Sequence, residues 1–394
     1  MKIGLVASQP LSESMGTSST IMGFGSALAD LGQEIHILAP GQETRVVKHN
    51  LTLHGYDGFG VSLLYKESRR LYNSPLLARR TVLRPKIIRS VIARFGVTIS
   101  KWLQNLRLDI VEGEQEIAAR ASLDEAKKVG LPCTSHFHNL WYQECLELGL
   151  LRSNDPELRS LEELTWGIIE ESDAVITPTE FMREFLMSRS GKSSSEIIHV
   201  PRGTTARLKA EIPPRTHNRL VYAGTLAMTQ GFHLLFQAIR VSAGDHEYVL
   251  CGKGEDEKKI RNMARDLGLN IKFCWFDNKN EYFEFLSKCS VGVIPWAKTP
   301  SRQLGFPMKL LDYMSVGLPV ICSQIGSWTS LVESHKIGVL CPSNPGHWAS
   351  SIDALLGDSD KTRLMGTRAL LLSRGEFSWA RCAKRLLETY QELS

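Results

Sequence analysis

The chain has 394 residues, 43% of them hydrophobic and 23% charged, with a formal net charge of +5. This size and composition predict a soluble globular protein, most plausibly of two domains. No apolar run is long enough to span a bilayer, and the opening KIGLVAS is too short for the apolar region of a signal peptide.

The eight cysteines show neither a CxxC motif nor paired metal-ligand spacing. Several lie in apolar runs such as IKFCWF and PVICS, which is typical of small core residues in a reducing compartment. We therefore expect a cytoplasmic protein, either free or peripheral on the cytoplasmic face of a membrane.

The first 200 residues predict one domain in which strands alternate with helices. Strands are expected over 2–8, 34–40, 108–114, 131–139 and 173–179. Helices are expected at about 19–32, with Ser18 or Ser19 as the cap, at 115–130 and directly after 179. Such alternation indicates a parallel, doubly wound sheet.

Positive charge is concentrated within this first domain. Residues 66–107 contain eleven Lys and Arg side chains and one acid, Glu67, a net charge of +10 that leaves −5 for the rest of the chain. Within it, 86–106 has the apolar stripe of a core helix. The cations on its outer face are suited to anionic lipid head groups, whereas nucleic acid fits less well because no reading motif accompanies them.

A linker and a second domain of the same kind follow. Residues 201–218 are rich in Pro and Arg and lack periodicity, which predicts a linker. The second domain, 219–375, has expected strands at 219–225, 247–255, 270–276, 290–296, 319–323 and 338–342. The amphipathic segment 376–394 is expected to pack back on the first domain. The sequence thus predicts an α/β protein of two Rossmann-like domains facing across a cleft, with ligands beyond the carboxyl ends of the strands.

The loop before the first helix contains small residues, including Gly16 and Thr17, which would let backbone amides approach an anion. An ordinary capped turn fits the same residues. The loop lacks GxGxxG, which argues against a nicotinamide-dependent oxidoreductase.

Two histidines and two carboxylates follow neighbouring strands. His136 and His138 are spaced to face one side of a strand, but no third metal ligand is evident. One alternative is a buried, hydrogen-bonded histidine; the other is a strand-end histidine, preferably His138, that contacts substrate or moves a proton. Glu112 is expected in a surface loop, while Glu114 is a weak candidate for the acceptor side together with His136. Asp358 and Asp360 are expected in a loop and predict no metal.

The segment GFPMKLLDYMSVGLPVICS predicts a short helix, a turn at Gly317 and a buried strand. Lys309 opposes the helix dipole at the N-terminal end. Either it is a solvated surface lysine, or an anion lies over that N-terminus.

These segments, taken in order, resemble the retaining glycosyltransferases of family 4, which have the GT-B fold. The resemblance covers nearly the whole chain and rests on IIHVPRG, RLVYAGTLAMTQGFHLLFQAI, YVLCGKGEDEKKI, DNKNEYFEFLSKCSVGVIP, GFPMKLLDYMSVGLPVI and FSWARCAKRLLETY. It implies metal-independent transfer of a sugar from a nucleotide-diphosphate donor, with retention, to a glycan or lipid-linked acceptor. No cofactor is expected beyond the nucleotide sugar as co-substrate, and no nucleic acid partner.

The resemblance also assigns candidate site residues and shows departures. The paired acids of the family fall on Leu304 and Asp312, and its phosphate-binding cations fall on Thr225 and Gln230. Lys309 would supply the missing positive charge, Asp312 would bind the ribose, and His138 and Asp312 are the catalytic candidates. The implied donor-binding residues are Gly16, Thr17, Gly224, Thr225, Gln230, Gly252, Phe276, Met308, Lys309, Leu311 and Asp312. The departures leave one alternative, a non-catalytic GT-B homologue that binds a sugar nucleotide or a partner protein.

Overall fold

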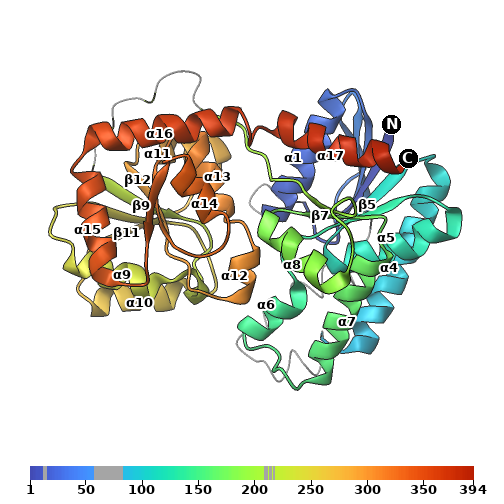
Figure 1. Cartoon of the computed structure of the whole chain (residues 1–394), viewed down its shortest axis with the longest axis horizontal. Helices are drawn as coiled ribbons and strands as arrows, with labels where there is room; N and C mark the ends of the chain where they lie inside the picture. Colours follow the sequence, from blue (N-terminus) through green and yellow to red (C-terminus); the bar gives the residue numbers. More distant parts are fainter. Residues whose placement is uncertain (12–15, 57–82, 208–211, 213–214, 216–217) are drawn as a thin grey trace. The chain divides into compact units, whose positions relative to one another are not determined.

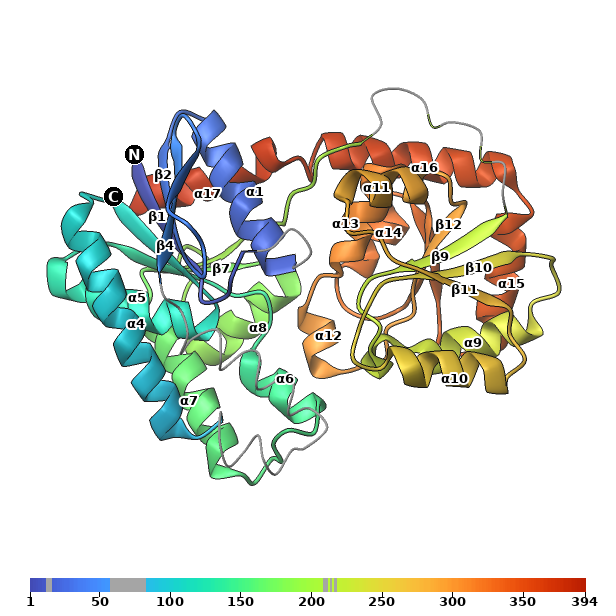
Figure 2. The same ribbon diagram turned by 180° about the vertical axis from the view of Figure 1, so that it is seen from behind.

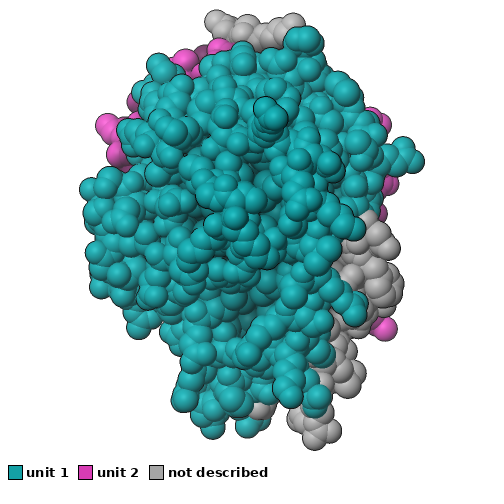
Figure 3. All heavy atoms as spheres, turned by 90° about the vertical axis from the view of Figure 1, so that its right-hand side faces the viewer, with its two compact units in different colours: residues 1–203, 379–394 teal, residues 204–378 magenta. Residues whose placement is uncertain are grey.

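Two parallel sheets, each covered by helices on both faces, organise the chain (Figure 1). The computed structural model describes residues 1–11, 16–56, 83–207, 212, 215 and 218–394. One compact unit consists of Met1–Gly203 and Trp379–Ser394, and the other of Thr204–Ser378; Figure 3 colours them separately. The α/β, doubly wound fold class is therefore confirmed.

The sheet of the first unit has the strand order β3-β4-β2-β1-β5-β6-β7-β8. All neighbouring strands are parallel except β3, which runs antiparallel to β4. Its strands are β1 (Lys2–Val6), β2 (Glu34–Pro40), β3 (Arg45–Lys48), β4 (Leu51–Tyr56), β5 (Ile110–Glu114), β6 (Cys133–His136), β7 (Ala174–Thr177) and β8 (Ile197–His199). The sequence did not predict β3, β4 or β8.

Helices pack on both faces of this sheet (Figure 2). The helices are α1 (Gly16–Asp30), α4 (Pro85–Asn105), α5 (Gln115–Val129), α6 (Trp141–Glu147), α7 (Pro156–Glu171), α8 (Glu180–Ser190) and α17 (Trp379–Leu393). Helices α1 and α17 share one core with β1 and β2. The opposite face carries α4, whose Trp102 lies so close to Gly4 of β1 that a side chain there would overlap it. Helix α1 starts at Gly16, so Ser18 and Ser19 lie inside it and the expected cap there is wrong.

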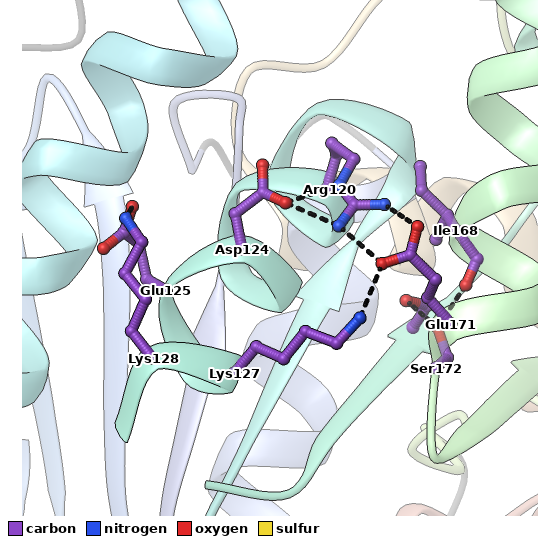
Figure 4. Close-up of polar contacts among 9 residues, drawn as sticks. Arg120, Asp124, Glu125, Lys127, Lys128, Ile168, Glu171 and Ser172 are labelled. Atoms are coloured by element: carbon purple, nitrogen blue, oxygen red, sulfur yellow. Dashed lines mark hydrogen bonds and ion pairs between the residues drawn. The ribbon is translucent and has the colours of Figure 1, made fainter. Parts of the chain in front are cut away.

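An ion-pair network joins α5 to α7 on the surface of this unit (Figure 4). Arg120 donates to Glu171 at 2.9 Å and also contacts Asp124, while Lys127 lies 3.1 Å from Glu171. The hydrogen bond from Arg120 is the main reason that the pKa of Glu171 falls to about 2. The network fixes how α5 lies beside α7, and so supports the helix that follows β5.

The sheet of the second unit has the order β11-β10-β9-β12-β13-β14, with every neighbouring pair parallel. The strands are β9 (Arg219–Ala223), β10 (Glu247–Cys251), β11 (Ile271–Cys274), β12 (Val291–Ile294), β13 (Val320–Ser323) and β14 (Gly338–Cys341). The order reverses between β9 and β12. In sheets of this kind the crevice that binds ligands opens at that reversal, beyond the carboxyl ends of the strands.

Two hydrophobic cores hold the helices of the second unit to the sheet. One face packs against α9 (Phe232–Val241), α10 (Glu257–Asp266) and α15 (Pro345–Leu356), and the other against α11 (Lys279–Ser287), α13 (Met308–Ser315), α14 (Thr329–Ser334) and α16 (Ser359–Arg374). Short α12 (Pro300–Leu304) connects β12 to α13. Asp358 caps α16 by accepting from the backbone N–H of Lys361 at 2.9 Å, so the expected loop at 358–360 is instead a helix start.

Helix α4 contains most of the described part of the basic stretch; Arg84 and Arg107 lie just outside it. Its apolar stripe, including Ile88, Phe95 and Ile99, is buried, which confirms the core-helix interpretation. Residues 57–82, with their expected cations from Lys66 to Arg80, lie outside the described residues. Within the described ranges, no helix combines the length and apolarity needed to cross a membrane.

Candidate functional site

The loops after β9 and β10 approach each other through bare backbone. Gly224 has φ of 140°, in the range that favours glycine, and its carbonyl oxygen occupies the space that a side chain at Gly252 would need. Thr225 is exposed, and its carbonyl oxygen accepts a hydrogen bond from the Tyr222 hydroxyl at 2.7 Å. The predicted Gly224 and Gly252 thus lie together beside the reversal of the strand order.

Gln230 is the centre of a buried polar cluster at this place. Its side-chain oxygen accepts hydrogen bonds from Lys309 Nζ at 3.0 Å and from the Trp296 indole N–H at 3.1 Å. Lys309 Nζ also lies 3.9 Å from the centre of the Tyr222 ring. Residues from β9, from the 3₁₀ turn Met228–Gln230, from the end of β12 and from α13 therefore meet at one point. We call Tyr222, Gln230, Trp296 and Lys309 the amide cluster.

Lys309 is 9% exposed, which excludes the solvated-surface interpretation. Burial, followed by the charge of Arg302, lowers the pKa of its ammonium well below the usual value, while Asp312 opposes the shift. Among the described residues, no carboxylate lies within ion-pair distance of Lys309. Among the hydrogen bonds within the described ranges, Lys309 donates to the neutral amide of Gln230. A buried cation without an anionic partner is costly, so this arrangement favours a negatively charged ligand.

Asp312 lies on the same helix and accepts a hydrogen bond from the Tyr282 hydroxyl at 3.0 Å. Burial raises the pKa of this carboxyl to about 6, although the Tyr282 hydrogen bond and nearby cations lower it. Leu304, where the family has its other acid, is buried at 3% exposure. Leu311 is a core residue, and Met308 and Phe276 pack partly buried against the same core, so the structure gives these three a packing role.

Sequence reasoning missed Tyr222, Trp296 and Arg302. Trp296 ends the SVGVIPW segment two residues after β12, at the carboxyl end where ligands bind. This position at the carboxyl end of a predicted strand could have marked Trp296 as a candidate site residue in the sequence. Arg302 stacks its guanidinium 4.5 Å from the centre of the Trp296 ring.

In the first unit, the ends of β5 and β6 contain a buried hydrogen-bond network. Glu112 is 2% exposed, so the expected surface loop is wrong: both faces of this parallel sheet are covered, and a polar strand residue has no solvent to face. One carboxylate oxygen contacts His136 Nδ1 at 3.1 Å, and the other accepts from the Tyr390 hydroxyl at 2.8 Å. His136 is therefore the buried, hydrogen-bonded histidine of the first alternative. Tyr390 comes from α17 and was not predicted.

His138 follows β6 and lies beside this network. Its ring is 4.7 Å from that of His136, and its Nε2 is 3.7 Å from Glu114 Oε1. Neither ring nitrogen of His138 has a hydrogen-bond partner among the described residues, although the residue is only 7% exposed. Burial, then the positive charge of Arg202, lowers its pKa well below the usual value. The lowered pKa favours the neutral imidazole, and both of its buried ring nitrogens are without a hydrogen-bond partner among the described residues.

Glu114 and Arg202 complete this group. Burial, together with the charge of Glu112, raises the pKa of Glu114 well above the usual value. Burial also lowers the pKa of Arg202 to about 10. We call Glu114, His138 and Arg202 the histidine cluster.

Gly16 and Thr17 form the first residues of α1, and their side chains lie outside the described part. No group of three His, Cys, Asp or Glu within the described ranges is arranged to hold a metal ion.

Comparison with known proteins adds two family matches. Residues 15–207 match the model described as Glycosyltransferase Family 4, and residues 205–370 match Glycosyl transferases group 1. An uncharacterised glycosyltransferase of Methanocaldococcus jannaschii is 25% identical over 278 residues, covering 66% of this chain and 75% of its own length.

Solved structures share the fold. Sucrose-phosphate synthase from Thermosynechococcus elongatus superimposes with a TM-score of 0.80 at 15% identity, covering all of this chain and 98% of its own. Anabaena HepE in complex with UDP-glucose gives a TM-score of 0.70 at 15% identity, with complete coverage of both chains. These likenesses show the two-sheet GT-B fold.

Proposed function

Because the chain belongs to the group 1, family 4-like glycosyltransferases of the GT-B fold, we propose that it transfers a sugar with retention from a nucleoside-diphosphate donor to a glycan or lipid-linked acceptor. The observation that supports this most directly is Lys309, a buried cation beside the reversal point of the second sheet that has no carboxylate partner in the described part of the chain. UDP-glucose is the first donor to test, since HepE was solved with it.

In this proposal the leaving diphosphate lies against Lys309 and against backbone amides of the loop that contains Gly224. Lys309 then stabilises the charge that develops as the glycosidic bond breaks, and no metal ion is required. Asp312 accepts from the ribose hydroxyls. Because the pKa of Asp312 is raised to about 6, a fraction of the protein molecules carries a protonated Asp312 near that pH, and the carboxyl must lose this proton before both of its oxygens can accept from the ribose.

His138 contacts the transferred sugar or the reacting centre through its neutral imidazole. Its ring nitrogens have no partner among the described residues, so hydrogen bonds to sugar hydroxyls would satisfy groups that are otherwise buried at a cost. Gly16 and Thr17 are proposed to contact the donor phosphate through backbone at the start of α1. Glu114 remains the proposed acceptor-side residue, whereas His136, which is fully buried and bonded to Glu112, is no longer proposed to contact the acceptor.

A peripheral membrane association is part of the proposal. The outer face of α4 exposes Lys86, Arg89, Arg94 and Lys101, and the helix contains no acidic residue. Val97 is 57% exposed between these cations. Basic and apolar side chains on one helix face suit an anionic lipid surface, on which a lipid-linked acceptor would be found. Co-sedimentation with vesicles should require anionic lipid and weaken as salt is added; binding that ignores both would contradict this part.

The decisive test is calorimetric titration with UDP-glucose and GDP-linked sugars. We expect one donor to bind, and Lys309→Met to weaken that binding 10- to 100-fold, because a charged hydrogen bond is lost. The matched control is Lys288→Met, since Lys288 is exposed and pairs with Glu284 on the surface. Equal loss in both variants would contradict the assignment. Tight binding without hydrolysis or transfer by the unsubstituted protein would favour the non-catalytic homologue.

A further inference from the structure

We propose that Arg302 is the second cation that binds the donor diphosphate, acting together with Lys309. The inference rests on the proposed function and deepens it. Where the family has its two phosphate-binding cations, this chain has Thr225 and Gln230, neither of which is charged. The amide cluster places one substitute, Lys309, on Gln230. The structure assigns a second substitute at the other side of Trp296.

The position of Arg302 is fixed by local structure. It lies in α12, whose N-cap Thr299 accepts from the Arg302 backbone N–H at 3.4 Å, and Pro300 is in the first turn. Its guanidinium stacks on the Trp296 ring, and the edge of the same indole donates to Gln230. Trp328 packs edge-on against Trp296 at 5.8 Å between ring centres. One indole therefore positions both Gln230, which contacts Lys309, and Arg302.

The electrostatics point to an anion between these two cations. The charge of Arg302 lowers the pKa of the Lys309 ammonium, second only to burial, and it opposes the burial that raises the pKa of Tyr222. The charge of Arg302 therefore acts on the site of the buried ammonium. Two adjacent phosphate groups would provide one acceptor group for each of these two cations.

The chemistry of the guanidinium beside Trp296 suits this role. A guanidinium is planar and carries several N–H donors, which can form paired hydrogen bonds with phosphate oxygens. A lysine at 302 would keep the charge but lose the stacking and the paired geometry. Binding by Arg302 would therefore depend on both its charge and its shape.

The competing explanation is that Arg302 only covers Trp296 and stabilises the fold. The two explanations differ in what the ligand must contain. If Arg302 contacts phosphate, replacing it weakens UDP binding and leaves uridine binding unchanged. If Arg302 only packs on Trp296, replacing it either weakens the binding of both ligands or lowers the melting temperature without changing either affinity. The experiment therefore compares the two ligands on the full chain.

We would measure UDP binding by calorimetry and uridine binding by ligand-observed NMR for the unsubstituted chain, Arg302→Gln and Arg302→Lys. The expected result is a 10- to 100-fold loss of UDP affinity in Arg302→Gln, partial recovery in Arg302→Lys, and unchanged uridine affinity. Arg261→Gln is the matched control, because Arg261 stacks 4.0 Å from the Phe273 ring in the same unit and lies on α10. It should leave UDP affinity unchanged.

The outcomes separate the two levels of the proposal. If the unsubstituted chain binds UDP and Arg302→Gln binds it equally well, the inference is wrong and the proposed function stands. If Arg302→Gln weakens uridine as much as UDP, Arg302 has a packing role and the inference is again wrong. If the unsubstituted chain binds no nucleoside diphosphate, including GDP, the proposed function fails and the inference fails with it.

Discussion

The amide cluster of the second unit and the histidine cluster of the first both bury ionisable groups, but they differ in the hydrogen-bond partners that they give them. Both place ionisable groups where burial disfavours charge. Lys309 has a neutral hydrogen-bond acceptor and an aromatic ring beneath it, while His138 has no partner for either ring nitrogen among the described residues. A partly satisfied cation can hold a ligand that is always charged. An unsatisfied imidazole suits hydroxyl groups, which can both donate and accept.

The comparison predicts that the histidine cluster governs rate and the amide cluster governs affinity. Replacing His138 with Ala should lower the rate of sugar transfer at least 100-fold, the usual scale for a group that acts on the reacting centre, and leave UDP affinity within about twofold. Assays quenched at fixed times measure the rate of sugar transfer, and calorimetry measures the affinity for UDP. If His138→Ala lowered the transfer rate and the UDP affinity to a similar extent, His138 would act by supporting the fold, and the proposed division of roles between the two clusters would be wrong.

The network behind the histidine cluster can be weakened one hydroxyl at a time. Tyr390→Phe removes the hydrogen bond to the Glu112 carboxylate and should lower the free energy of unfolding by about 1.5–3 kcal/mol, the range for bonds to charged groups. Tyr248→Phe is the control, because that hydroxyl donates to the neutral Ser242, and it should cost about 1 kcal/mol or less. Equal losses in chemical denaturation would mean that Glu112 gains little from Tyr390.

Affinity at the amide cluster should depend on pH in a defined direction. Burial and Arg302 lower the pKa of Lys309 in the free protein, and Asp312 opposes them; a bound diphosphate would raise it again. Binding then takes up a proton at high pH, so UDP affinity should fall as pH rises above 7, by at most about tenfold per unit. Lys309→Arg should flatten this dependence because arginine stays charged. If UDP affinity changed with pH equally in the unsubstituted protein and in Lys309→Arg, a group other than Lys309 would be responsible for the pH dependence.

A second dependence on pH is expected at Asp312. Its folded-state pKa of about 6 lies above the ordinary value of 3.8, so the ionised carboxylate destabilises the folded state and stability falls as pH rises through this window. Asp312→Asn should therefore raise the free energy of unfolding by up to about 3 kcal/mol at pH 8 and leave it nearly unchanged at pH 4. The same variant should bind UDP less tightly. A gain that is independent of pH would contradict the burial argument.

The sequence predicted most of the architecture and only part of the site. Alternating apolar segments located both series of strands, but the predicted ends ran too far: 247–255 was expected where β10 stops at Cys251, because Gly252 turns the chain away. Lys309 was located because a cation at a helix N-terminus is locally anomalous. Local anomalies of this kind can be read in a sequence.

What could not be read are the partners that the fold brings from far along the chain. Tyr390 and Glu112 are 278 positions apart, and neither has a local pattern that marks it. Gln230 was assigned as a departure from a family pattern, yet its importance lies in accepting from Trp296 and Lys309, which are 66 and 79 positions away. The buried polarity of Glu112 was likewise invisible, since strand periodicity does not reveal which faces of a sheet are covered.

The first unit is built from two separate pieces of chain, Met1–Gly203 and Trp379–Ser394, whereas the second is continuous. During synthesis on the ribosome, α17 therefore emerges only after the whole second unit, a delay on the order of 10–35 s at the usual rate of translation. Until then the α1 face of the first sheet lacks α17, and Glu112 lacks the Tyr390 hydroxyl. Until α17 has been translated, the nascent chain must hold an incomplete first unit with an uncovered apolar face.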